Sequence, residues 1–184
     1  MSAGSDWSNI RRTIQTKVGN SMVLDGRSVP IYHDYTESDP DNRRESGNQK
    51  AAWVETKFLT QGAGRRADAL WQLDLYSRKG PPNSTTADQF GLFIDRMATA
   101  LCSPFRGVDP TGLQRGKFHV LDFSDPTAPT STTMCLFMQN ARGDIGEPDE
   151  IARLDFYEDF RRATVTMRFR TVQDASGPAS YYTT

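Results

Sequence analysis

At 184 residues the chain has the length of one ordinary domain, and a domain of this size buries roughly 70% of the surface that its unfolded chain exposes. Its 22 basic and 23 acidic side chains give a net charge of −1. This balance argues against a main partner that is nucleic acid, because duplex binding depends on neutralising phosphates. No apolar run is long enough to span a membrane, and the N-terminus has neither the basic nor the apolar region of a signal peptide.

The cysteine content points to a reducing compartment. Cys102 and Cys135 are the two cysteines of the chain, and neither belongs to a Cys-x-x-Cys pair. The sequence therefore indicates neither a disulfide framework nor a zinc site.

The first predicted element is a helix over residues 6–18. Its apolar residues recur at spacings of three and four, and they are Trp7, Ile10, Ile14 and Val18. Ser5 or Asp6 can accept hydrogen bonds from the free N–H groups at its start.

A strand and a loop follow this helix. Apolar and polar residues alternate over 29–34, which predicts a strand, and Pro30 places that strand at a sheet edge or at its own beginning. Residues 36–50 contain no Val, Ile, Leu or aromatic residue, so we expect a mobile loop there.

The centre of the chain predicts a long hairpin and then a helix. Period-two patterns over 51–59 and 69–78 indicate two paired strands, with a connection at 60–68. Residues 87–102 place an apolar stripe at helical spacing, and Asp88 in the first turn suits the helix dipole.

Four further strands are predicted over 118–123, 134–138, 154–157 and 163–172. Most predicted strands thus follow one another directly, and strands do not alternate regularly with helices. This order predicts an α+β fold, with a mixed, mainly antiparallel sheet and two helices packed on one face. We expect a single domain over residues 1–172 and an extended tail over 173–184.

No motif in the chain carries recognisable enzyme or cofactor chemistry. Residues 62–67, GAGRRA, match a loosened dinucleotide fingerprint, but the pattern after them predicts a strand where the fingerprint needs a helix. His33 with Asp34, and His119 with Asp122, fall on opposite strand faces and lack further metal ligands. The segment that opens at Asp39 lacks the glycine and glutamate of a calcium loop.

Two groups of basic residues are candidates for contacts with a partner. Arg65 and Arg66 stand at the predicted hairpin tip, and Arg78 and Lys79 flank the following connection. Four arginines cluster around the last strand, where they fit either a charged sheet face or edge that discourages unwanted pairing, or a subunit contact. The candidate interface residues are Arg65, Arg66, Arg78, Lys79, Arg168 and Arg170.

The element order carries a family resemblance. A short helix leads to a Val-Pro-Ile-Tyr strand, the hairpin AAWVETKFLTQ and ADALWQLDLYSR, the helix DQFGLFIDRMATALC, and the strands FHVLDF and RRATVTMRFRTV. This order over residues 7–172 resembles the tail terminator, or tail completion, proteins of long-tailed bacteriophages (siphophages). The pattern Trp71–Tyr76 is similar to the strand before the central helix of that family. The 36–50 loop and the segment 138–153, which we interpret as an insertion, depart from it.

The resemblance implies a structural virion protein and no enzyme, metal or cofactor. It would form a hexameric ring on the tail tube, stop tube polymerisation and present a surface to the head–tail connector or neck protein. Assembly would occur in the host cytoplasm, and ring closure would use a heterologous contact. Another neck or head-closure component, a tail-tube subunit, and a small-molecule-binding enzyme are the alternatives.

Reversing the charge at the predicted hairpin tip tests its role in assembly. Changing Arg65 and Arg66 together to glutamate should leave the far-ultraviolet circular dichroism spectrum unchanged, because surface substitutions have small effects on stability. The same change should reduce the yield of rings or joined tails in electron micrographs. Normal assembly by the double variant would remove both arginines from the interface.

Overall fold

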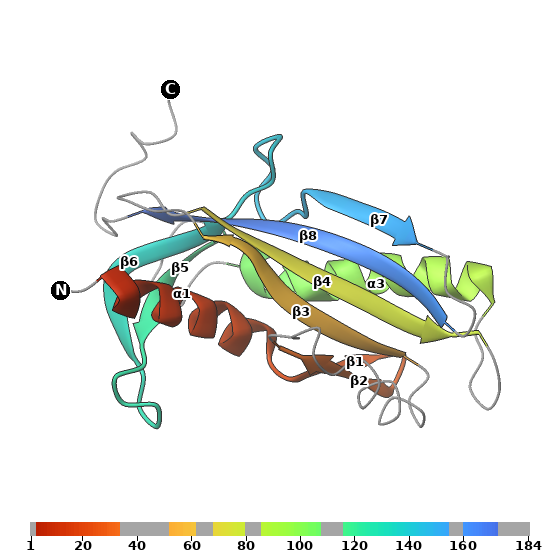
Figure 1. Cartoon of the computed structure of the whole chain (residues 1–184), viewed down its shortest axis with the longest axis horizontal. Coiled ribbons are helices and arrows are strands. Elements are labelled where there is room, and N and C mark those ends of the chain that lie inside the picture. Colours follow the sequence, from red (N-terminus) through yellow and green to blue (C-terminus); the bar gives the residue numbers. More distant parts are fainter. Residues whose placement is uncertain are drawn as a thin grey trace.

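The computed structural model describes residues 3–33, 52–61, 68–79, 86–107, 116–154 and 160–172, and the fold is built from these (Figure 1). Within them lie two helices, α1 (Ala3–Val18) and α3 (Ala87–Arg106). The strands are β1 (Ser21–Leu24), β2 (Arg27–Tyr32), β3 (Ala52–Gln61), β4 (Asp68–Arg78), β5 (Lys117–Asp122), β6 (Thr130–Met138), β7 (Glu150–Leu154) and β8 (Phe160–Val172).

The strands form one mixed sheet in the order β1-β2-β3-β4-β8-β6-β5, with β7 also paired to β8. All neighbours are antiparallel except β2 and β3. Strand β8 is the longest, and on its side away from β4 it pairs first with β7 and then with β6. The predicted α+β class, with a mainly antiparallel sheet and two helices, is therefore confirmed.

The structure contains a strand, β1, that was not among the predicted elements. β1 and β2 are joined by Asp25 and Gly26, which have φ of 52° and 74°. Positive φ at both positions is the mark of a two-residue type I′ turn, whose twist matches that of the paired strands. An Asp-Gly pair that follows the apolar run Met22–Leu24 and precedes the alternating residues Val29 and Ile31 is the sequence signal that could have found this hairpin.

The two positions expected for Pro30, at a sheet edge or at the beginning of its strand, are both wrong: β2 lies between β1 and β3, and Pro30 is the fourth residue of β2. Ile31 N donates to Asn20 O at 2.8 Å, so the neighbouring Pro30 needs no N–H towards β1. Pairing with β3 starts only at Ile31. Proline is tolerated because its missing donor faces neither ladder.

Several other boundaries differ from those predicted. Helix α1 begins at Ala3, so the start expected at Ser5 or Asp6 is wrong. Strands β6 and β8 begin earlier than predicted, at Thr130 and Phe160. Of the strand expected at 154–157, only Leu154 lies among the described residues, where it ends β7 (Glu150–Leu154), which pairs with β8. Helix α3 continues to Arg106 through Pro104. The long hairpin is confirmed, with a register shift between Phe58 and Thr60. The expected mobile loop at 36–50 and the tail at 173–184 lie outside the described residues, as does most of the hairpin tip.

The start of α3 is closed by a reciprocal pair of hydrogen bonds. Thr86 Oγ1 accepts from Gln89 N at 3.2 Å, and Gln89 Oε1 accepts from Thr86 N at 2.8 Å. This capping box satisfies two N–H groups that the helix itself cannot pair. The helix therefore begins at a defined residue and presents its apolar stripe to the sheet.

One hydrophobic core draws residues from both helices and from most of the strands. From β4 and β8 it takes alternate residues that lie opposite one another, as in the pairs Trp71–Met167 and Leu73–Val165. From the helices it takes Ile10, Ile14, Val18, Phe90, Ile94, Met97, Ala98, Leu101, Cys102 and Phe105. The chain from α1 to β8 thus shares a single apolar interior.

Trp71 is the central side chain of this core and offers a direct test. It is fully buried, and its ring stacks on Phe58 with centroids 5.9 Å apart. Trp71→Ala should lower the free energy of unfolding, measured by urea titration, by about 3–5 kcal/mol. Leu92→Ala, at an exposed position of α3, should change it by less than about 0.5 kcal/mol. Equal effects of the two changes would contradict this account of the core.

Candidate assembly surface on the sheet

Residues of β3, β4 and β8 that point away from the core form a second, polar face of the sheet, which we call the outer face. Glu55, Asp74 and Thr164 lie side by side across it, and β7 adds Ala152 to the same row. The neighbouring rows are Trp53–Tyr76–Arg162 and Lys57–Gln72–Thr166. Glu55 and Asp74 are only 6% and 5% exposed, so this polar face is packed and not freely solvated.

Asp74 is the centre of the hydrogen bonds on the outer face. Its Oδ2 accepts from Arg162 Nη2 at 2.7 Å, and its Oδ1 accepts from Thr164 Oγ1 at 2.8 Å and Gln72 Nε2 at 2.9 Å. A buried carboxylate is tolerated only when donors occupy its lone pairs, as they do here. Asp74 therefore ties β4 to β8.

An aromatic group lies beside this network and separate from the main core. Trp53 stacks on Tyr76 with centroids 5.0 Å apart, and Phe160 meets the edge of Tyr76 at 5.4 Å. Trp53 Nε1 donates to Glu55 Oε1 at 3.1 Å, which satisfies both polar groups. The outer face is thus rigid at its centre, with both apolar and charged parts.

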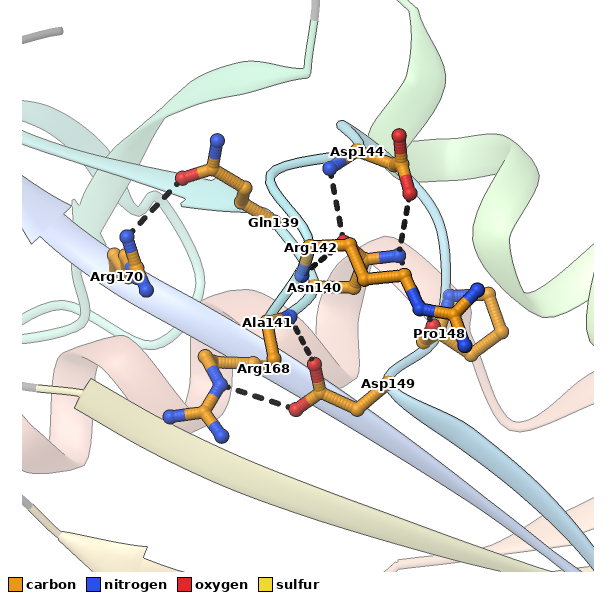
Figure 2. Close-up of polar contacts among 9 residues, drawn as sticks. All are labelled: Gln139, Asn140, Ala141, Arg142, Asp144, Pro148, Asp149, Arg168 and Arg170. Carbon is orange, nitrogen blue, oxygen red and sulfur yellow. Dashed lines mark hydrogen bonds and ion pairs between the residues drawn. The ribbon is translucent and has the colours of Figure 1, made fainter.

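The two predicted arginines of β8 are held by the connection between β6 and β7 (Figure 2). Arg168 Nε donates to Asp149 Oδ2 at 3.0 Å, and Asp149 Oδ1 also accepts from Ala141 N at 2.5 Å. Arg170 Nη1 donates to Gln139 Oε1 at 3.2 Å. These arginines orient a neighbouring segment of the same chain, a role that strand pattern alone does not reveal.

The connection itself is organised by Asn140 (Figure 2). Its Oδ1 accepts from Arg142 N at 3.0 Å and Asp144 N at 2.8 Å, and its Nδ2 donates to Asp144 Oδ2 at 3.0 Å. Arg106 at the end of α3 then donates to Gly146 O at 3.1 Å. The segment interpreted from the sequence as an insertion is therefore an ordered connection bound to both α3 and β8.

The predicted interface residues do not gather in one place. Arg78 pairs with Phe160 in the ladder, eight positions before Arg168, so roughly 26 Å of strand separates the two arginines. Arg78 and Lys79 are half-buried at the end of β4. Arg65 and Arg66 lie outside the described residues. The role of these residues as interface residues stays a prediction.

Among the described residues, three strands lie at edges of the sheet: β5, β1 and β7. Side chains of α1 cover β5, because Leu121 N donates to Thr13 Oγ1 at 2.9 Å and Phe123 N donates to Asn9 Oδ1 at 3.2 Å. In the part of the chain that the structure describes, β1 pairs only with β2 and β7 pairs only with β8. Open edges of this kind are templates for pairing with another strand.

The histidine and cysteine side chains contact neighbouring residues of the fold or are buried in it. The ring nitrogens of His33 are 3.0 Å from Thr56 Oγ1 and 2.8 Å from Gly19 O. His119 Nδ1 lies 3.6 Å from the Sγ of Cys135 on the adjacent strand. Burial raises the pKa of Cys102 to about 12, which keeps it a neutral thiol near pH 7. The described residues contain no group of three side chains that could hold a metal ion.

Comparison with known proteins gives no relative: no family model and no curated protein matches the chain. No helix among the described residues has the length and apolar character needed to cross a membrane. The geometry of the sheet itself is therefore the basis for a proposal about function.

The Asp74 network predicts a stability difference between two acidic residues. Asp74→Ala should lower the free energy of unfolding by about 3 kcal/mol, because it leaves the Arg162 guanidinium without its buried carboxylate. Asp95→Ala, at an exposed position of α3, should change it by less than about 0.5 kcal/mol. Chemical denaturation measures both. A small effect at Asp74 would show that this network is dispensable.

Proposed function

We propose that the chain is a structural virion protein that forms a ring, caps a phage tail tube, ends tube polymerisation and provides the head–tail joining surface. The observation that carries the proposal is that the described sheet has one covered edge and two open ones. A subunit with two open edges can contact a neighbour on each side, as a ring requires. The element order from α1 to β8, on which the resemblance to tail terminators rests, supports the same assignment.

The proposal includes a two-layer subunit, in which α1 and α3 lie on the same face of the sheet. Its support is that α1, α3, β4 and β8 contribute to one core. Residues on the outer face bond across strands and to the 139–149 connection, as Asp74 and Arg168 do. A subunit of this form offers an ordered polar face and ordered connections to whatever lies above or below the ring.

The partners proposed are other copies of this chain, a tail-tube protein and a head–tail connector or neck protein. A hexamer is the ring size that the resemblance implies. Of the candidate basic residues, Arg65, Arg66, Arg78 and Lys79 would meet acidic groups on these partners, since arginine pairs well with carboxylates. Arg168 and Arg170 would instead hold the 139–149 connection beside that contact. The site of action would be the virion, after assembly in the host cytoplasm.

The two alternative functions, a tail-tube subunit and a small-molecule-binding enzyme, predict different assembly states. A tail-tube subunit would polymerise into long tubes, whereas a terminator would stop at one ring. A small-molecule-binding enzyme would remain a monomer or dimer, and it would need ionisable groups that converge on a ligand. Asp74, a buried acid of the outer face, is already occupied by three donors from its own chain.

The mass of the purified protein across a concentration series tests the proposal. Light scattering after size exclusion should give a closed ring of about six subunits, or a monomer that forms one on concentration. Negative-stain images of the same fractions should show single rings. Long tubes would identify a tube subunit, and a monomer or dimer at every concentration would contradict the ring.

A further inference from the structure

The geometry points to a specific ring contact: β1 of one copy pairs in parallel with β7 of the next, so that the sheet continues from chain to chain. This inference rests on the proposed function and adds the contact surface and strand direction that would close the ring. The occupant of each open edge is a second copy of this chain.

The choice of strands follows from how the edges are protected. Thr13 and Asn9 of α1 already accept from the backbone N–H groups of Leu121 and Phe123, so β5 is covered where these groups lie. Strand β1 and strand β7 remain as the open ends of the described sheet. Of the five exposed large hydrophobic residues in the described chain, Val23 (75% exposed) lies on β1 and Ile151 (40%) lies on β7.

The hydrogen-bond pattern of β1 shows which backbone groups face outward. Leu24 and Arg27 close the two-residue turn, and Ile31 N donates to Asn20 O. Bonded positions alternate in an antiparallel ladder, so Met22 also bonds to β2. The N–H and C=O groups of Ser21 and Val23 therefore point away from β2, and no strand of the described residues pairs with them.

Strand β7 has a helix beside its open edge. Ile151 and Arg153 lie on the core side of the sheet, since Ile151 pairs with Val165. The Arg153 guanidinium lies close to Gly91 of α3. An exposed edge strand is a surface on which an extended segment can add.

Strand directions decide how two copies can pair. The antiparallel and parallel pairings along the sheet give β1 and β7 the same direction. In a ring, each copy is related to the next by a rotation, and the sheet continues in the same strand direction. Strand β1 of one copy therefore meets β7 of the next as a parallel neighbour. A two-fold dimer would instead join β1 to β1, or β7 to β7, as antiparallel strands.

Charge favours the parallel arrangement. Asp25 follows the C-terminal end of β1, and Arg153 lies near the C-terminal end of β7. Parallel pairing brings these opposite charges together, while antiparallel pairing of the same strands would bring Asp25 to Glu150. Asp25 accepts from Arg96 of its own chain in an exposed ion pair, and Arg153 would add a second cation.

Site-specific crosslinking tests the contact in the full chain. Val23 lies between Met22 and Leu24, which pack on the core, and so it shares the outer side with Ala152, which pairs with Thr164. Neighbouring strands are about 4.8 Å apart. The variants Val23→Cys and Ala152→Cys, mixed and treated with a short bismaleimide, should give a crosslinked dimer that neither variant gives alone.

The matched control is Ile151→Cys, which is adjacent to Ala152 but on the other face. Mixed with Val23→Cys it should crosslink far less. The natural Cys102 and Cys135 are fully buried and should not react in the folded protein. A crosslink in Val23→Cys alone would show β1–β1 contact and overturn the inference.

The outcomes separate this inference from the proposed function. Rings that form without the mixed crosslink would overturn the β1–β7 contact and leave the ring in place. The mixed crosslink in linear chains without ring closure would support the contact and contradict the terminator. Absence of any assembly would overturn both.

A backbone variant gives a second, independent measurement. Val23→Pro removes an outward N–H without removing a bond to β2, while Val23→Thr keeps that N–H and the branched shape. With circular dichroism confirming both folds, the proline variant should lose the ring and the threonine variant should retain it. Rings formed by folded Val23→Pro would overturn the contact.

Discussion

The pairing of β4 with β8 is the interaction on which the rest of the structure depends. It runs without a break from Asp68–Arg170 to Arg78–Phe160 and joins segments far apart in the chain. The two faces of this strand pair make different contacts. On the core side, Trp71 and Leu73 pack against β8. On the outer face, Asp74 binds Arg162 and Thr164. Because β8 is longer than its neighbours, it can also accept β7 and β6 in succession along its other side.

The outer face shows how a polar sheet surface becomes rigid. Asp74 and Asp149 each bind an arginine of β8, and each also accepts further hydrogen bonds from its own chain. Polar networks of this kind hold elements in one arrangement, and removing a single partner lowers stability. For an assembly subunit, such rigidity means that contacts made at one end of the sheet are presented in a fixed geometry at the other.

The edges of the sheet distinguish where a second chain can add from where it cannot. Natural proteins cover edges that must not pair, and α1 does so at β5 through Thr13 and Asn9. The contrast with β1 and β7 indicates which edges are left for another chain. Ring closure by these strands would use main-chain hydrogen bonds for affinity, and side chains such as Asp25 and Arg153 for direction. Neither strand pattern nor composition contains this information.

The sequence by itself determined the α+β class, the β3–β4 hairpin and α3, because these depend on local periodicity. It also contained the Asp25-Gly26 turn signal, although the predicted elements did not include that hairpin. Only the tertiary structure decided the place of Pro30, the position of β7, the partners of Arg168 and Arg170, and the covering of β5. Each of these depends on which distant segment supplies the neighbouring hydrogen bonds. Periodicity along one strand reports its buried face, but not its neighbours.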